Sequence, residues 1–563
     1  MLRNARIHKC PRLAPCLRAS VTSVFHLAVT STIRAALVLI TLLHLSACID
    51  HWGPLEPDWQ AQLDKEAQRA RDVTVDRPST VTPMVAPVTL PDGSIALSVE
   101  QAALIALQNN RDLAVQQLNP VITGTFEDIE RSRFDVELYA QGEYFREKTQ
   151  EVSRSTIDRF NVTGDAATAA AGVRTDLPTG TTIDASVQQD RTISNRSPEQ
   201  QEARVGLSIT QSLLQGFGPS VNLAAIRQSQ LDTLASRYEL RGFTEELLAQ
   251  MEIAYWNYIL AQEEIAIFER SLEVARTQRD EVEERINVGV LPQTEAAAAR
   301  TEVAVREQAL INARSRLEQQ RIRLLRLINP TPAGDLRTPV TTTTDPRHDT
   351  GAITDIADRL ALAMQLRSDL SEARLRLEQN RLQTIVTRNG LLPRLDLFIN
   401  LGKTGYAGTT IEDSFRDLDG ETYDFTAGVA FSHLLGNRAA EARHLAARAA
   451  RQQSAAAVAN LEQLARVDVL VAISEAERTR QQIAASALTA ELQQQTVDAE
   501  RERFQVGAST ALLVAQAQRD LLQAQINEVD AIINHRIALV NLYLAEGSLL
   551  ERRGIVTQTP ARP

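Results

Sequence analysis

The clearest chemical pattern in the sequence is formed by a cysteine and the short apolar run before it. Ala35–Leu43 is apolar but too short to span a bilayer, so it predicts the core of a signal peptide. The tripeptide Leu-Ser-Ala at 45–47 directly precedes Cys48, the pattern that a lipoprotein signal peptidase reads once the thiol is acylated. We therefore predict a signal peptide at 1–47 and lipidation of Cys48, whose acyl chains would hold the protein at a membrane. The alternative is an ordinary signal peptide with an incidental cysteine.

The surroundings of Cys48 also predict where the chain resides. Ile49 follows it, and because this position is not Asp, the sorting rule for bacterial lipoproteins directs the chain to the outer membrane, from which it would extend into the periplasm. Cys10 and Cys16 lie inside the predicted leader, so the mature chain keeps one cysteine. A disulfide framework or a thiolate metal site within one chain is thereby excluded.

Few other residues have the spacing that catalysis or metal binding requires. The histidines are scattered and lack metal-ligand spacing: His51, His348, His433, His444 and His535. The sequence has no glycine-rich phosphate loop and no nucleophile elbow. Its many Asp and Glu residues are typical of solvated helix faces. We expect no enzyme activity, no cofactor and no bound metal.

The composition indicates which elements must position these residues. Ala, Leu, Gln, Arg and Glu dominate a chain of 563 residues in which aromatic residues make up only 4%. This mixture is typical of long packed helices. The formal net charge is −11, although the leader carries six basic residues and no acidic one. An acidic mature surface argues against a nucleic-acid partner, which would require a basic face.

The chain contains a tandem duplication. Three segments of its first half recur in the same order in its second half: 106–113 as 363–370, 206–209 as 428–431, and 285–289 as 503–507. We therefore divide the mature chain into repeats at 97–330 and 353–552. A proline-rich irregular segment at 48–96 precedes the repeats, a connector at 331–352 joins them, and a tail at 553–563 follows.

Each repeat reads as a helix, then strands, then a pair of very long helices. No proline interrupts the chain between Pro219 and Pro292, and Gly507 is the only glycine between Gly436 and Gly547. About 65 helical residues would form a rod of roughly 100 Å, so coiled-coil packing is expected. Apolar residues on the last helix alternate steps of three and four, which predicts one buried stripe: Leu522, Ile526, Val529, Ile533, Ile537, Val540 and Leu544.

The reversal of each pair of long helices falls at a Val-Gly dipeptide. Val288-Gly289 and Val506-Gly507 stand where the two rods must turn, and Pro292 suits the first turn of a returning helix. We predict both sites to be hairpin tips.

Short segments of alternating polarity predict strands. Apolar or small residues alternate with polar ones at 134–144 and again at 395–401, the pattern of a barrel strand with lipid on one side and water on the other. A half-solvated sheet on a soluble domain would alternate in the same way. A further hairpin at 172–187, turning at 177–180, occurs only in the first repeat. Four strands, or six with this hairpin, do not comfortably close a barrel, so several protomers would share one.

With these features, the chain resembles the TolC-like outer-membrane efflux proteins, especially their lipoprotein branch, over residues 97–552. The most specific matches are the segment 97–113 with its repeat, the strand-to-helix passages 213–216 and 434–436, and the two Val-Gly tips. The resemblance implies a mainly α-helical homotrimer. Its duplicated hairpins would form an α-barrel, its strands a shared twelve-stranded β-barrel, and its termini and connector part of an equatorial belt.

The resemblance also implies the partners. The tips would meet the hairpins of a periplasmic adaptor that joins an inner-membrane pump, through the residues Val288, Gly289, Val290, Leu291, Val506, Gly507, Ala508 and Ser509. The channel would conduct substrates passively in a tripartite efflux or type I secretion system. The rival interpretation is a periplasmic coiled-coil lipoprotein that acts as a spacer or adaptor without a pore, but the repeated hairpin and strands favour the channel. The identity of the cargo is left open.

The chain departs from the family pattern beside the second tip. The best-known member has constriction-lining carboxylates at places that correspond to Leu513 and Gln516, and neither of these is acidic. An acidic ring that binds cations is therefore in doubt. The expected tunnel mouth is closed by apolar contact or by Glu295 near the other tip.

Overall fold

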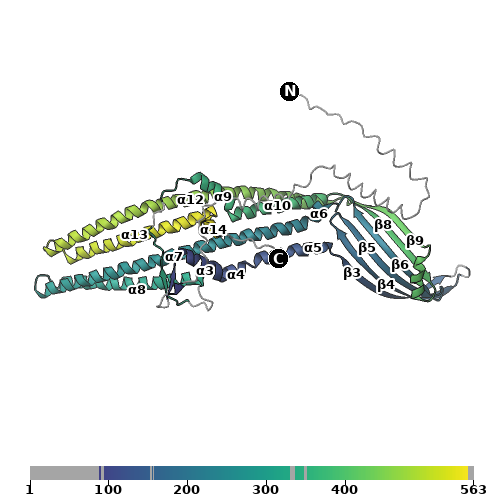
Figure 1. Ribbon diagram of the computed structural model, residues 1–563, viewed down its shortest axis with the longest axis horizontal. Helices are drawn as coiled ribbons and strands as arrows, with labels where there is room; N and C mark the ends of the chain where they lie inside the picture. The colour runs from purple at the N-terminus through teal and green to yellow at the C-terminus, as the bar shows by residue number, and fades with distance from the viewer. Residues whose placement is uncertain are drawn as a thin grey trace, which may run out of the picture. The chain divides into compact units, whose positions relative to one another are not determined.

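The computed structural model describes residues 88–89, 94–152, 155, 157–329, 336–347 and 351–555. All of them belong to the second of two compact units, Lys65–Pro563. The predicted signal peptide and Cys48 lie outside the described residues. The described part consists of long helices, a large sheet and a small one (Figure 1).

The first repeat begins with three short helices in succession: α3 Val99–Asn109, α4 Arg111–Gln116 and α5 Asn119–Arg131. Ser98 starts α3 with a capping box, because its hydroxyl accepts from the Gln101 amide at 3.2 Å while the Gln101 side chain accepts from the Ser98 amide at 3.1 Å. Asn110 separates α3 from α4 and caps α4 by accepting from the Leu113 amide at 2.9 Å. The second repeat has the same interruption at Arg367, between α9 Ile356–Leu366 and α10 Ser368–Asn389.

Each repeat contains one helix of the predicted length. After the short α6 Pro219–Asn222, α7 runs 64 residues, Ala224–Asn287, and α12 runs 68 residues, Arg438–Gln505. The returning helices are shorter than predicted, because α8 Thr294–Ile328 has 35 residues and α13 Ala511–Glu546 has 36. Left-handed residues end both of them, Asn329 at φ +42° and Gly547 at φ +67°.

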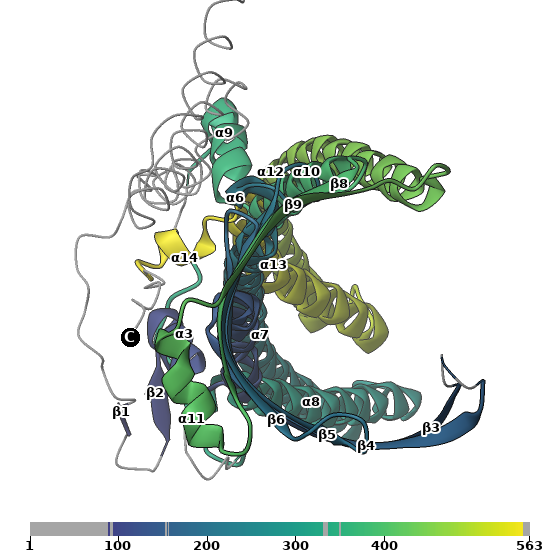
Figure 2. The same cartoon turned by 90° about the vertical axis from the view of Figure 1, so that its right-hand side faces the viewer.

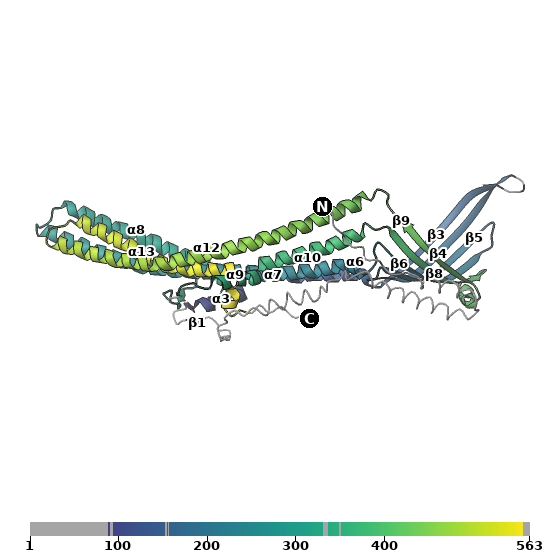
Figure 3. The same cartoon turned by 90° about the horizontal axis from the view of Figure 1, so that it is seen from above.

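Each long helix is covered along one half of its length by returning helices and along the other half by shorter helices. Towards the tips, α8 packs on α7 and α13 packs on both α12 and α7; towards the sheet, α5 packs on α7 and α10 packs on both α7 and α12. Figure 3 shows this division of the long helices. The predicted stripe on α13 is confirmed: Leu522, Val529, Ile533 and Val540 are buried, and Ile526, Ile537 and Leu544 pack against the same core.

The large sheet has six antiparallel strands in the order β3-β4-β5-β6-β8-β9. Their bounds are β3 Glu137–Val152, β4 Arg159–Leu177, β5 Thr181–Ser194, β6 Gln200–Ser212, β8 Arg394–Ala407 and β9 Tyr423–Ser432. Figure 2 shows the sheet as a curved wall. The prediction that the first strand begins at Phe134 is wrong, because Ser132–Phe134 forms a 3-10 helix, η2, at the end of α5. The connection between β8 and β9 holds α11 Ile411–Arg416 and the 3-10 helix η3 Asp417–Asp419.

The predicted turn at 177–180 is confirmed and depends on two glycines. The Gly180 amide donates to the Leu177 carbonyl at 2.9 Å, with Gly180 at φ +84°. A Cβ at Gly180 would lie 2.3 Å from the carbonyl oxygen of Gly216, in the passage from β6 to α6, so no larger residue fits there. The hairpin end is thereby held against the start of the helices.

A small sheet joins the two ends of the first repeat. β2 Ile95–Leu97 pairs in parallel with β7 Val340–Thr342, and β1 Val88–Thr89 pairs antiparallel with β2. The Tyr255 and Tyr258 hydroxyls of α7 donate to the carbonyls of Leu97 at 2.9 Å and Val340 at 2.8 Å. The segment before the first repeat and the connector after it therefore meet on the middle of α7.

Candidate functional site

Both predicted tips are tight helix-ending turns of identical construction. Gly289 and Gly507 lie at φ +78° and +79°. At the first tip, the Gly289 amide donates to the Ile286 carbonyl at 3.0 Å and the Val290 amide donates to the Arg285 carbonyl at 2.8 Å. At the second tip, the Gly507 amide donates to the Phe504 carbonyl at 3.1 Å and the Ala508 amide donates to the Arg503 carbonyl at 2.8 Å. This is the Schellman arrangement, which requires a left-handed residue that glycine adopts without steric cost. The prediction of hairpin turns at these two sites is confirmed.

The two tips of one chain pack together through an apolar cluster capped by a cation. Val282, Ala299, Phe504, Ala511 and Val514 are buried in it, from α7, α8, α12 and α13. Arg285 covers this cluster, with its guanidinium carbon 4.9 Å from the Phe504 ring centroid and its Nη1 donating to the Phe504 carbonyl at 3.3 Å. The second nitrogen of the same guanidinium donates to Glu281 at 2.7 Å.

The predicted adaptor-contacting residues differ in exposure. Val288, Val290 and Val506 are exposed and apolar, although valine normally avoids water. Leu291 packs against the cluster beneath the tips, and the Ser509 hydroxyl donates to Glu500 at 2.8 Å. Gly289, Gly507 and Ala508 are exposed as well, so a partner can reach these three residues together with the valines, while Leu291 and Ser509 support the turns.

The predicted constriction residues occupy the first turns of the two returning helices. Glu295 lies in the first turn of α8, and its amide donates to the Pro292 carbonyl at 3.2 Å. Leu513 and Gln516 lie in the first two turns of α13, where Leu513 is exposed, and the Thr510 hydroxyl caps this helix. Their places beside the tips are as expected, and a role in closing a tunnel remains a prediction.

The register of the large sheet separates its side chains into one apolar and one polar face. Successive residues of a strand point to opposite faces, and paired residues share a face. One row across all six strands joins Leu138, Val173, Ala185, Leu207, Leu401 and Phe425. Two neighbouring rows on the same face are mostly apolar or small: Ala140, Ala171, Val187 and Val205 in one, which continues to Lys403, and Ile183, Ile209, Ile399 and Ala427 in another. Charged residues occupy this face further along the strands: Arg146, Asp165 and Arg191.

The opposite face is polar and held by cross-strand hydrogen bonds. The Tyr139 hydroxyl and the Arg174 guanidinium both donate to Asp184 at 3.0 Å, and Arg204 donates to Asp424 at 2.7 Å. Carboxylates outnumber guanidinium groups on this face: Glu137, Glu143, Glu147, Glu151, Asp176, Asp184, Asp190, Glu202, Asp396 and Asp424 against Arg174, Arg204 and Arg394. The face is therefore suited to an aqueous lumen that carries negative charge.

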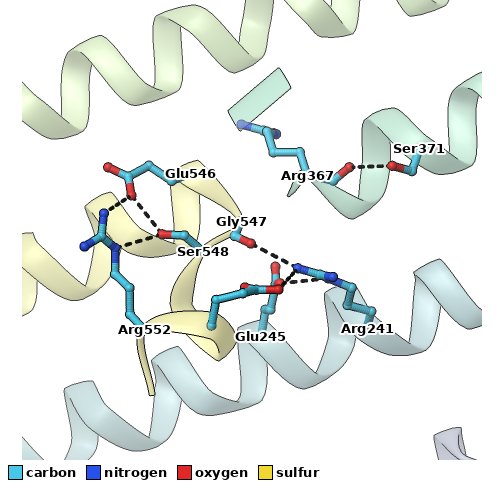
Figure 4. Close-up of polar contacts among 9 residues, drawn as sticks. Arg241, Glu245, Arg367, Ser371, Glu546, Gly547, Ser548 and Arg552 are labelled. Atoms are coloured by element: carbon cyan, nitrogen blue, oxygen red, sulfur yellow. Dashed lines mark hydrogen bonds and ion pairs between the residues drawn. The ribbon is translucent and has the colours of Figure 1, made fainter. Parts of the chain in front are cut away.

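A buried ionic network lies where α7, α9, α13 and α14 Leu549–Arg552 meet (Figure 4). The fully buried carboxylate of Glu546 accepts from Arg359 at 2.6 Å, from the Ser548 hydroxyl at 2.8 Å and from Arg552 at 3.2 Å. Beside it, Arg241 of α7 donates to Glu551 at 2.5 Å and to Glu245 at 3.2 Å. These contacts fasten the end of the second repeat to the first long helix.

Sequence reasoning missed this network because its partners are far apart in the chain. Arg359 and Glu546 are separated by 187 residues, and Arg241 and Glu551 by 310. Burial raises the pKa of Glu245 to about 8, although the charge of Arg241 opposes the shift. The network thus contains a carboxyl group whose burial favours the protonated form.

In the part of the chain that the structure describes, no helix is both long and apolar enough to cross a membrane. Within the same ranges, no group of His, Cys, Asp and Glu side chains has a metal-binding arrangement.

Long helical hairpins joined to a curved sheet with one apolar and one polar face define the fold of an outer-membrane channel protein. The model of the outer membrane efflux protein family matches residues 158–330 and 360–548, which is more than half of the chain. The chain therefore belongs to the outer membrane efflux protein family.

Individual relatives agree with this assignment. The chain is similar to the pyoverdine export outer membrane protein OpmQ of Pseudomonas putida, with 26% identity over 336 residues that cover 58% of this chain and 67% of OpmQ. The CmeC outer membrane channel of Campylobacter jejuni matches with a TM-score of 0.59 and 15% identity, covering 80% of this chain and 85% of CmeC. The open-state MtrE outer membrane channel of Neisseria gonorrhoeae matches with a TM-score of 0.58 and 19% identity, covering 86% and 96%. At such identities the structural matches establish the fold alone.

The resemblance to TolC-like outer-membrane efflux proteins is thus confirmed, and the role is that of an outer-membrane efflux channel. This sets aside the rival interpretation of a periplasmic spacer without a pore. The family and the fold are those of transport channels and not those of enzymes.

Proposed function

We propose that three copies of this chain form the outer-membrane duct of a tripartite efflux or type I secretion system. In this arrangement the large sheet lies in the outer membrane with its apolar face towards lipid. The long helices extend through the periplasm, and the tips meet an adaptor that joins an inner-membrane pump. The observation that supports this most strongly is the apolar row from Leu138 to Phe425, which continues across all six strands.

The sheet itself requires further copies. Among the strands that the structure describes, β3 pairs only with β4 and β9 pairs only with β8, so both edges of this sheet carry unpaired amide and carbonyl groups. Such groups are very unfavourable in hydrocarbon, where no water replaces the missing hydrogen bonds. If β3 of one copy pairs with β9 of the next, every edge is removed and the sheet closes into a shared barrel.

The helices present matching free faces at the same two ends. α5 leads into β3 and carries exposed apolar residues at helical spacing: Ile122, Phe126 and Ile129. α12 follows β9, and exposed leucines lie at this junction and in the first turns of α12: Leu434, Leu435 and Leu445. A head-to-tail contact that buries α5 of one copy against α12 of the next would close a ring. The rotation that places α5 of one copy against α12 of the next would then also pair β3 of the first copy with β9 of the second.

The lipid anchor at Cys48 is a second part of the proposal and rests on the sequence. Acylation would hold each copy at the outer membrane in addition to its sheet. A Cys48→Ser variant should lose incorporation of labelled fatty acid. If label persists in this variant, the anchor is elsewhere or absent.

Channel activity is tested by reconstituting the purified mature protein in planar bilayers. Discrete conductance steps from a protein that native mass spectrometry shows to be trimeric would support the duct. A monomer that never conducts would contradict it. If the trimer shows no conductance, the hairpin is truncated beyond Val282 and Ala299 to remove a closed tip. A truncated trimer that still does not conduct would also contradict the duct.

Contact of the tips with an adaptor is tested by photo-crosslinking in the native cell. A photoreactive residue at Val290 should capture a protein with the helical hairpin of an adaptor, identified by mass spectrometry. The matched control is Val305, which is also exposed but lies further along α8. Equal capture of the adaptor from both positions, or capture from Val305 alone, would contradict tip-to-tip contact.

A further inference from the structure

The two repeats contribute unequal numbers of strands. In the second repeat, β8 follows α10 and β9 leads into α12, with no other strand of the large sheet between them. In the first repeat, β3 follows α5 and β6 leads into α6 and α7, but β4 and β5 lie between them. The recurrence of 206–209 as 428–431 aligns β6 with β9. The hairpin β4–β5 is therefore the element that the first repeat has in addition.

This hairpin is part of the sheet and not an appendage to it. β4 pairs with β3 along the whole length of β3, from Glu137 opposite Arg174 to Val152 opposite Arg159. β5 pairs with β6 from Thr181 opposite Gln211 to Thr192 opposite Gln200. Near the helices its side chains follow the same division of faces, with Val173, Ala185 and Val187 in the apolar rows, whereas Asp165 and Arg191 occupy this face further along the strands. A lid or plug would need neither continuous pairing on both sides nor a lipid-compatible face.

Side chains on the polar face join the hairpin to its neighbours. Asp184 of β5 accepts from Tyr139 of β3 across the intervening strand β4. Gly172 of β4 makes this reach possible, because a Cβ there would lie 2.6 Å from the Tyr139 ring. Thr168 and Asp190 form a further pair at 2.6 Å within the hairpin. The geometry of β3 thus depends on β4 and β5 being in the wall.

From these observations we infer that the shared barrel of this protein has eighteen strands, six from each of three copies, and not the twelve implied by the family resemblance. The inference rests on the proposed trimer. Because barrel diameter grows roughly linearly with strand number, the pore through the membrane is about half as wide again as a twelve-stranded one. Barrels of this strand number leave an aqueous channel, and the carboxylates Asp184 and Asp190 that the hairpin adds face it. The hairpin therefore widens the outer exit for bulky cargo.

The sheet offers a clean way to remove the hairpin. Leu138 of β3 and Leu207 of β6 lie in the same apolar row with two strands between them, and β3 and β6 run in opposite directions. Replacing residues 146–199 by Asn-Gly would join Phe145 to Gln200 through a two-residue turn and keep Leu138 level with Leu207. This variant has two strands in each repeat, as the second repeat already has, and four strands per copy, as a twelve-stranded trimer requires.

The test is electron cryomicroscopy of both proteins in lipid nanodiscs. Eighteen strands in the wild-type trimer and twelve in a narrower pore of the variant are expected. A wild-type trimer with a twelve-stranded wall and the hairpin folded elsewhere would overturn the inference while leaving the proposed function intact. A dimer whose wall has twelve strands would overturn the inference and the trimer together. A monomer with no membrane-inserted sheet would overturn the proposed function itself.

Disulfide formation provides a measurement that does not depend on the variant folding. Leu138→Cys paired with Leu207→Cys should form no bond in the wild-type background, because two strands separate the residues. Leu138→Cys with a cysteine scanned along β9 at Phe425, Ala427 and Val429 should link neighbouring copies up to trimers. Efficient bonding of the first pair would show that β3 and β6 are adjacent and would contradict the eighteen-stranded wall.

Discussion

The guanidinium of Arg285 lies over the ring of Phe504, 4.9 Å from its centroid, and so joins the tip of the first helical hairpin to the tip of the second. The same group donates to the Phe504 carbonyl at 3.3 Å. This carbonyl belongs to the helix end that forms the second turn. The guanidinium therefore adds a polar link to the apolar cluster that joins the two tips.

Replacing Arg285 with alanine should loosen the second tip. The loss of one cation–π contact and one hydrogen bond amounts to about 1–2 kcal/mol, so amide hydrogen exchange of residues 504–510 should accelerate by roughly tenfold. Arg279→Ala is the matched control, because Arg279 lies on the same helix and pairs with its neighbour Asp280. Equal acceleration in the two variants would show that Arg285 does not link the tips.

The left-handed glycines of the tips predict a substitution pattern. A Cβ added at Gly289 or Gly507 would meet no atom within 4 Å, so the cost of a side chain comes from the backbone alone. Alanine at either site should destabilise the turn by about 1 kcal/mol, and asparagine by less, because asparagine tolerates the left-handed region. Hydrogen exchange at the tip measures the difference. An alanine variant as stable as the asparagine variant would argue against this explanation.

A buried ion pair in α8 predicts an asymmetry between single and double substitutions. Glu302 and Arg306 lie 2.6 Å apart with both side chains almost fully buried, and burial lowers the pKa of Arg306. Glu302→Leu leaves the arginine charge without its partner and should destabilise the protein by about 3–5 kcal/mol. Adding Arg306→Leu should recover most of that loss. Thermal unfolding followed by circular dichroism tests the pair, and a double variant less stable than the single one would contradict the expectation.

The buried Glu245 predicts a pH dependence of stability. Its folded-state pKa is about 8 against an ordinary value of 4.5, so the folded protein keeps a proton that the unfolded chain has lost above about pH 4.5. The stability from this proton is fully present below pH 4.5 and is lost as the pH rises towards 8. Glu245→Gln should flatten the fall of melting temperature between about pH 5 and 8. A slope unchanged by the substitution would assign the dependence to other groups.

The local signals of the sequence were sufficient for the turns and the buried stripes. A Val-Gly dipeptide at the end of a long helical pattern marks a Schellman turn whatever surrounds it, because the left-handed conformation is a property of the backbone. The alternation of apolar residues on α13 likewise depends only on helical periodicity. Both predictions therefore required no knowledge of distant contacts.

The extent of the strands could not be read in the same way. β4 contains a run of alanine, threonine and glycine at 166–172, so both of its faces carry small residues and the alternation disappears. Only pairing with β3 and β5 assigns each residue to the apolar or the polar side. The full length of the hairpin, and the choice between the four and the six strands that the sequence left open, are therefore visible only in the sheet.

The sequence by itself determined the helical composition, the duplication and the positions of the two tips, because each of these depends on residues close together in the chain. The tertiary structure decided how the long helices are covered, how many strands share the sheet, and which charges are buried together. Arg359 meets Glu546 across 187 residues, and Arg553 meets Glu252 across 301. Such pairings are selected by the packing of whole helices against one another, and no local pattern of residue types records them.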